Sequence, residues 1–170
     1  MSYTWRRRGK PLRIPTPGKN AKVAVCGAYR WPDGPFVFSH GPKSVNTERF
    51  VEMVTQLAHR ARRTGKVAVL VIDNGSNHTS KRSSQVLDQV RDFVRVVWLP
   101  PYSSEQLNDI ENLWKRLKED YFCRMLVKER TTFEAAVVAL LRNLRTQGSV
   151  RRLLRARLPR MRCKNLVRAA

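Results

Sequence analysis

The fold of this chain is decided by the stretch Val67-Ala-Val-Leu-Val-Ile-Asp73-Asn-Gly-Ser-Asn-His78. Residues 67–72 are uniformly apolar and rich in β-branched side chains, which is typical of a strand that is covered on both faces. Asp73 follows directly, at the carboxyl end of this predicted strand, where open α/β sheets bind their ligands. Asp73 is therefore a candidate metal ligand, although Asp-Asn-Gly is also ordinary turn chemistry.

A second stretch, Leu99-Pro-Pro-Tyr-Ser-Ser-Glu-Gln-Leu-Asn-Asp-Ile-Glu111-Asn-Leu-Trp114, predicts a turn followed by an amphipathic helix. At about 100° per residue, one face of this helix gathers the apolar residues Ile110, Leu113, Trp114 and Leu117. Glu111 falls at the edge of that stripe, so it is held against the core without being buried, as a metal-binding carboxylate requires. The alternative is a first-turn Glu that the helix dipole favours, and Asp109 is either a rival ligand or a first-turn charge.

The pattern before these stretches predicts a hairpin and a helix. Strands are expected over Val23–Tyr29 and Phe36–Phe38, joined by an Asp-Gly turn at residues 33–34 into an antiparallel hairpin. Apolar residues then recur at helical spacing from Asn46, which can cap the helix, to Gly65, which can end it.

The pattern between and after the two stretches completes an α/β fold. A polar helix at about residues 80–92 and a second apolar strand over Val94–Leu99 follow the first stretch, and this order predicts a parallel crossover. A capping box at Thr131–Glu134 predicts the start of another helix.

The composition indicates a polyanionic partner. The chain has 170 residues, enough for one domain with a core, and its 34 Lys and Arg against 13 Asp and Glu give a net charge of +21. Such a charge favours binding to nucleic acid or to an anionic membrane. The three cysteines show no zinc spacing and predict no disulfide. No apolar run approaches the roughly 20 residues of a membrane span, so we expect a cytoplasmic, nucleoid-associated protein without a membrane partner.

Basic residues concentrate at both ends of the chain. Residues 1–22 are expected to form a basic arm and residues 147–170 a basic helix or tail, with the domain proper over residues 23–146. A charge run of this kind is often only a solvated surface, but the absence of acidic residues at either end favours phosphate contacts. The candidate DNA-binding residues are Arg6, Arg7, Arg8, Lys10, Lys115, Lys118, Arg151, Arg152 and Arg155.

The two acidic stretches together resemble the second and third acidic motifs of DDE transposases, in the bacterial insertion-sequence group related to mariner elements. The segment Trp5-Arg-Arg-Arg-Gly9-Lys-Pro11 resembles the family's Trp-x-x-x-Gly segment. The resemblance implies a ribonuclease H-like mixed sheet flanked by helices, in which two Asp and one Glu hold Mg²⁺ or Mn²⁺. It also implies DNA cleavage and strand transfer, with Asp73 and Glu111 as catalytic residues and metal ligands. The DNA partners would be transposon ends and target.

The resemblance has one major departure. The family's first Asp lies on a first strand shortly before the Trp-x-x-x-Gly segment, and the chain begins four residues before Trp5, so we expect that strand to be missing. With two of three carboxylates, this chain alone is expected to be inactive unless an upstream-frame product supplies the rest. A homodimer is a further possible assembly. The alternative is a non-catalytic DNA-binding remnant, or a regulatory partner of a full-length transposase.

Overall fold

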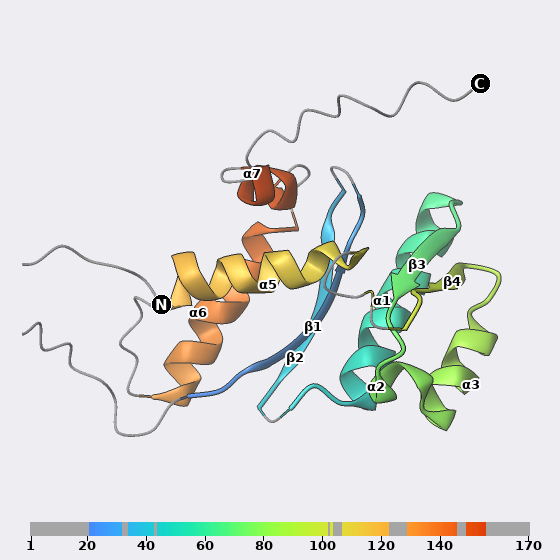
Figure 1. Cartoon of the computed structure of the whole chain (residues 1–170), viewed down its shortest axis with the longest axis horizontal. Helices are drawn as coiled ribbons and strands as arrows, with labels where there is room; N and C mark the ends of the chain where they lie inside the picture. Colours follow the sequence, from blue (N-terminus) through green and yellow to red (C-terminus); the bar gives the residue numbers. More distant parts are fainter. Residues whose placement is uncertain are drawn as a thin grey trace, which may run out of the picture.

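The computed structural model describes residues 21–31, 34–42, 44–101, 103, 107–122, 129–145 and 149–155. Most of the predicted basic arm and tail lie outside these residues, so the division of the chain into arm, domain and tail stays a prediction. Figure 1 shows the elements in chain order, which are β1 Ala24–Tyr29, β2 Phe36–Gly41, α1 Thr47–Thr64, β3 Ala68–Ile72, α2 Ser76–Thr79, α3 Lys81–Gln89, β4 Val94–Trp98, α5 Asp109–Asp120, α6 Arg130–Asn143 and α7 Ser149–Arg155. Within the described residues, none of these helices has the length and apolar character needed to cross a membrane.

The described strands form two separate two-stranded sheets. Strands β1 and β2 pair antiparallel, with Tyr29 opposite Phe36, which confirms the predicted hairpin. Strands β3 and β4 pair parallel, with Ile72 opposite Trp98, which confirms the predicted crossover. The expected single mixed sheet is not seen within the described residues, because no described strand hydrogen-bonds to both β1 and β3.

Helix α1 packs against both two-stranded sheets and joins them in one core. Its buried residues Phe50, Met53 and Val54 pack with Cys26 and Val37 of the hairpin, and also with side chains of β3, β4 and α3. The predicted ends of α1 are confirmed. The Asn46 side chain accepts a hydrogen bond from the backbone N–H of Arg49, and Gly65 ends the helix at a φ of 65°, where an L side chain would be strained.

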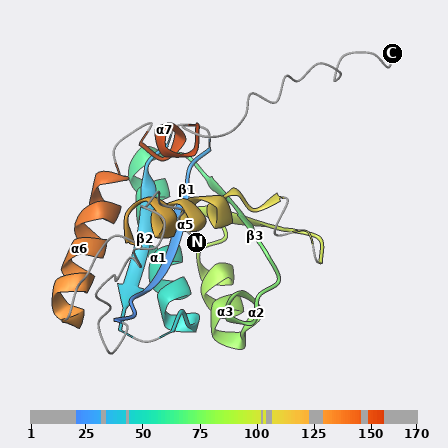
Figure 2. The ribbon, with the colours of Figure 1, turned by 60° about the vertical axis from the view of Figure 1, so that its left-hand side comes forward.

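The opposite face of the hairpin is covered by the last three helices. Phe36 and Phe38 pack in a second cluster against Leu113 and Leu117 of α5, with further buried residues from α6 and α7. This confirms the predicted apolar stripe of α5. Figure 2 shows α6 beside β2, and α2 and α3 on the other side of the molecule next to β3. The predicted capping box at Thr131–Glu134 is wrong, because α6 begins at Arg130 and its N-cap residue makes no side-chain capping bond.

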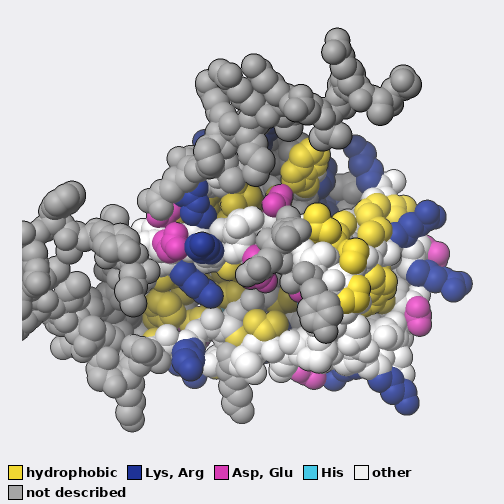
Figure 3. Space-filling model, in the orientation of Figure 1, with side chains coloured by type: hydrophobic (Ala, Val, Ile, Leu, Met, Phe, Trp, Pro, Cys, Tyr) yellow, Lys and Arg dark blue, Asp and Glu magenta, His cyan; other side chains and the backbone are white. Residues whose placement is uncertain are grey.

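One face of the β3–β4 sheet is open, contrary to the prediction that residues 67–72 are covered on both faces. Val69 is 64% exposed, Val71 49% and Val97 48%, whereas Leu70 and Ile72 are buried against α1. Figure 3 shows the resulting group of hydrophobic side chains over β3 and β4. The physical reason is that α5, α6 and α7 gather on the hairpin, so only the β1–β2 sheet receives a second helical layer.

Cys26 gives a testable pH dependence of stability. Burial raises the pKa of its thiol to about 11, from 9.0. The folded state therefore holds this proton more tightly than the unfolded state, and stability is lost as the pH rises from about 9 to 11. In urea denaturation, titration of Cys26 should lower the free energy of unfolding of the wild type by roughly 2–3 kcal/mol across that pH range. We expect the Cys26→Ala variant to lack this decrease. An identical pH profile for the variant and the wild type would contradict the burial of this thiol.

Candidate metal centre

Asp73 is fixed by its own loop at the carboxyl end of β3. Its Oδ1 accepts a hydrogen bond from the Gly75 backbone N–H at 3.0 Å and lies 2.9 Å from Nδ1 of His78. The neighbouring Asn74 side chain donates to the Leu99 carbonyl at 2.8 Å, which ties the loop to the end of β4. Since both bonds use Oδ1, the described residues leave Oδ2 of Asp73 open to a cation.

His78 links this loop to the hydrophobic core. It lies in the short helix α2, and its ring packs on the ring of Phe50 with the centroids 4.6 Å apart. His78 therefore contacts both the Asp73 carboxylate and the core residue Phe50.

Glu111 lies in the first turn of α5, where its backbone N–H donates to the Asn108 carbonyl at 3.0 Å. Its side chain is exposed and makes no hydrogen bond or ion pair within the described residues.

Asp109, in the same first turn of α5, has a partner, because its Oδ2 accepts a 3.2 Å hydrogen bond from the Tyr29 hydroxyl. Burial, and then the charge and hydrogen bond of Asp109, raise the pKa of Tyr29. Asp109 therefore ties α5 to β1, which favours its structural interpretation over its role as a rival ligand.

No hydrogen bond, ion pair or shared partner joins Asp73 and Glu111 in the part of the chain that the structure describes. The same residues contain no group of three or more His, Cys, Asp and Glu side chains that could hold a metal ion. Figure 1 shows α5 beginning on the side of the β3–β4 sheet and running away from it across the hairpin. Glu111 thus lies at the end of α5 that is turned toward β3, and the joint binding of one ion by the two carboxylates stays a prediction.

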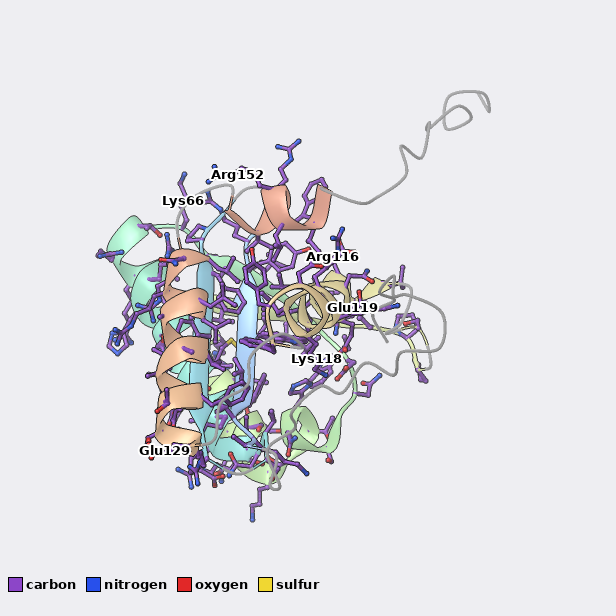
Figure 4. All side chains as sticks on the ribbon, turned by 90° about the vertical axis from the view of Figure 1, so that its left-hand side faces the viewer. Lys66, Arg116, Lys118, Glu119, Glu129 and Arg152 are labelled. Carbon is purple, nitrogen blue, oxygen red and sulfur yellow. The ribbon has the colours of Figure 1, made fainter. Side chains whose placement is uncertain are left out.

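The predicted DNA-binding residues are only partly described. Lys115 and Lys118 are exposed on α5, and their spacing from Glu111 places all three on one stripe of the helix. Arg152 is exposed on α7, whereas Arg151 is partly buried and has an interaction partner. Figure 4 shows Lys118 on α5 well apart from Arg152 at the end of the molecule formed by α7. The remaining candidates lie outside the described residues or have an undescribed side chain, namely Arg6, Arg7, Arg8, Lys10 and Arg155.

Comparison with known protein families decides the class of protein. A family model described as DDE superfamily endonuclease matches residues 1–134, which is most of the chain and includes both acidic stretches. The chain belongs to the DDE superfamily endonuclease family. Endonucleases of this superfamily generally depend on divalent metal ions, which fits a candidate site made of carboxylate oxygens.

This chain of the DDE endonuclease family is also similar to a curated insertion-element protein. It is similar to the insertion element IS630 uncharacterized 39 kDa protein of Shigella sonnei, with 32% identity over 115 residues. The match covers 68% of this chain and 32% of the relative, so the chain spans about a third of the length of that protein. Among solved structures, the simian T-cell lymphotropic virus intasome in complex with PP2A regulatory subunit B56 gamma contains a similar chain, at 15% identity and a TM-score of 0.39. That match covers 91% of this chain and 60% of the other.

Proposed function

We propose that this chain is the part of an insertion-sequence transposase that carries the second and third metal-binding carboxylates for DNA cleavage and strand transfer. The observation that carries the proposal is the geometry of Asp73. Its Oδ1 is held by His78 and Gly75 at the end of a parallel strand, and its Oδ2 faces no described partner. A carboxylate pre-oriented in this way suits a hard divalent cation, Mg²⁺ or Mn²⁺, and Glu111 is the second ligand.

We infer that a further strand lies between β1 and β3 and completes a ribonuclease H-like sheet. Three features support this inference. Both half-sheets pack on the same helix, α1, and the facing edges of β1 and β3 have no described strand partner. The valines of β3 and β4 expose one face of their sheet, which a wider sheet with its own helices would cover. Unpaired strand edges of this kind are costly, so they favour pairing with an added strand.

The roles of the protein groups follow from charge and position. A bound divalent ion would stabilise negative charge on the attacking and leaving oxygens of the phosphodiester. His78 holds Asp73 in place, so little reorganisation is needed when a ligand binds. Lys115 and Lys118 share the stripe of Glu111 on α5 and would neutralise DNA phosphates beside it. The DNA partner, a homodimer and an upstream-frame product all remain parts of this proposal.

A second candidate is a non-catalytic DNA-binding protein or a regulatory partner of a full-length transposase. The described residues favour it in one respect, because they contain no group of three or more His, Cys, Asp and Glu side chains that could hold a metal ion. Both candidates predict DNA binding, and they differ in whether cleavage is restored when the missing strand is supplied.

The experiment compares the purified 170-residue chain with a joined protein, in which the coding sequence immediately upstream is fused in frame. Each is incubated with supercoiled DNA carrying the element ends, with Mg²⁺, Mn²⁺ or EDTA. We expect metal-dependent nicking by the joined protein and none by the chain alone. Nicking by neither protein, with DNA binding intact, would instead support the non-catalytic candidate.

A further inference from the structure

A pocket lined by arginines lies at the carboxyl ends of α1 and α6. It has a volume of about 460 Å³, and its lining includes Phe36, Gln56, His59, Arg60, Arg63 and Arg145. None of the described residues that line it is acidic. None of its three arginines takes part in an ion pair between described residues. The candidate catalytic residues come from other elements, so this pocket is separate from the proposed metal centre.

Two cations of this pocket, Arg60 and Arg63, lie three residues apart on α1 and so share one stripe of the helix. Burial, and then the positive charges of Arg63 and Arg30, lower the pKa of Arg60. The Arg145 guanidinium stacks over the Phe38 ring at 4.9 Å, and the Gln56 side chain donates to the Phe38 carbonyl at 3.2 Å. Arg145 and Gln56 are therefore held against β2, while Arg60 lies near other positive charges. A bound anion would relieve the repulsion between these charges.

The pocket and Asp73 lie toward opposite ends of α1. Phe50, near the start of the helix, contacts His78, whereas Arg60 and Arg63 come in its last turns. At about 1.5 Å of rise per residue, the side chains of Arg60 and Arg63 attach to the helix roughly 15–20 Å beyond that of Phe50. A single phosphate group bound at the metal centre could not reach this pocket.

Further cations extend the positive surface beyond the pocket. Figure 4 shows Lys66, just after α1, and Arg152 on α7 at one end of the molecule, and Glu129, just before α6, at the opposite end. Arg142 is exposed in the last turn of α6, near the same end as Arg145. A surface with cations from three helices exceeds what one small anion needs and suits a repeating polyanion.

We propose that this pocket binds backbone phosphates of DNA at a position separate from the cleavage site. The planar guanidinium groups of Arg60, Arg63 and Arg145 match phosphate oxygens in bidentate geometry. Contacts of this kind position a duplex without reading its sequence. The proposal rests on the proposed function in naming DNA as the polyanion, but it requires neither a metal ion nor cleavage.

The test measures the affinity of the full chain for a 20-base-pair duplex in EDTA at several salt concentrations. The variant Arg60→Gln/Arg63→Gln is compared with the control Arg95→Gln/Arg130→Gln, which removes two exposed arginines from β4 and the start of α6. We expect the pocket variant to bind roughly tenfold more weakly at moderate salt. The slope of log K against log salt should fall by about 0.9 per lost phosphate contact, so by about 1.8. The control variant should change the slope less. The variant Arg60→Lys/Arg63→Lys, which keeps both charges, should retain most of the wild-type slope.

Two outcomes would overturn the proposal. One is an unchanged affinity and salt slope for the pocket variant when circular dichroism shows that it is folded. The other comes from titrating inorganic pyrophosphate into the same proteins. If the pocket substitutions abolish pyrophosphate binding but leave duplex binding intact, the pocket takes a free phosphate compound and not DNA. Because these measurements are made in EDTA and follow binding and not cleavage, a failure of this proposal would remain distinguishable from a failure of the cleavage proposal.

Discussion

Replacing Asp73 with Asn in the joined protein is expected to reduce metal-dependent DNA cleavage by about 1,000-fold, or about 4 kcal/mol of transition-state stabilisation. The substitution keeps the shape of the side chain but removes the charge that would hold a cation. Because His78 and Gly75 contact Oδ1, the loop should keep its conformation with an amide at this position. The measurement is the rate of nicking under single-turnover conditions, at saturating Mg²⁺ or Mn²⁺.

Asp88→Asn is the matched control for this prediction. Asp88 is exposed near the carboxyl end of α3, where a negative charge is disfavoured by the helix dipole. The same chemical change there should leave the cleavage rate within about a factor of two. Cleavage by the Asp73 variant at a rate close to that of the Asp88 variant would rule out Asp73 as a metal ligand.

The second large effect is expected on stability. Phe50→Ala should lower the free energy of unfolding by about 3–5 kcal/mol, because the ring is 1% exposed and lies in the core that joins both half-sheets. Net stabilities of domains are about 5–15 kcal/mol, so this single change would remove a large share. Urea denaturation followed by circular dichroism measures the effect.

Two comparisons sharpen the test of Phe50. Tyr121→Ala removes another aromatic ring, but from a side chain that is 42% exposed, and should cost well under half as much. Phe50→Leu should keep most of the stability while removing the ring that packs on His78 at 4.6 Å. We therefore expect Phe50→Leu to fold and to cleave DNA more slowly in the joined protein. A loss below about 1 kcal/mol for Phe50→Ala would contradict the position of α1 in the core.

Local signals predicted the elements of this chain well. Asn46 and Gly65 set the ends of α1 through their own side chain and backbone, so neighbouring sequence was sufficient to identify them. The hairpin and the parallel crossover likewise follow from strand spacing. The start of α6 was predicted wrongly because a capping box is only one way to begin a helix, and here the helix begins at Arg130, before that box.

Features that depend on distant residues could not be predicted. The apolar run 67–72 shows that β3 favours burial, but not whether a second layer is available, and Val69 remains exposed. His78, which contacts Asp73, also packs on Phe50, and Phe50 comes from another element. The arginine pocket combines the ends of α1 and α6, whose proximity no sequence spacing reveals.

The central claim is that Asp73 and Glu111 bind the same divalent ion. The most direct test is a titration of Mn²⁺ into the joined protein, followed by electron paramagnetic resonance, for the wild type, Asp73→Asn, Glu111→Gln and the double variant. If the ligands share one ion, each single substitution should weaken binding at least about tenfold, and the double variant should lose much less than the sum of both effects. Unchanged Mn²⁺ affinity in Glu111→Gln, or fully additive losses in the double variant, would contradict a shared metal site.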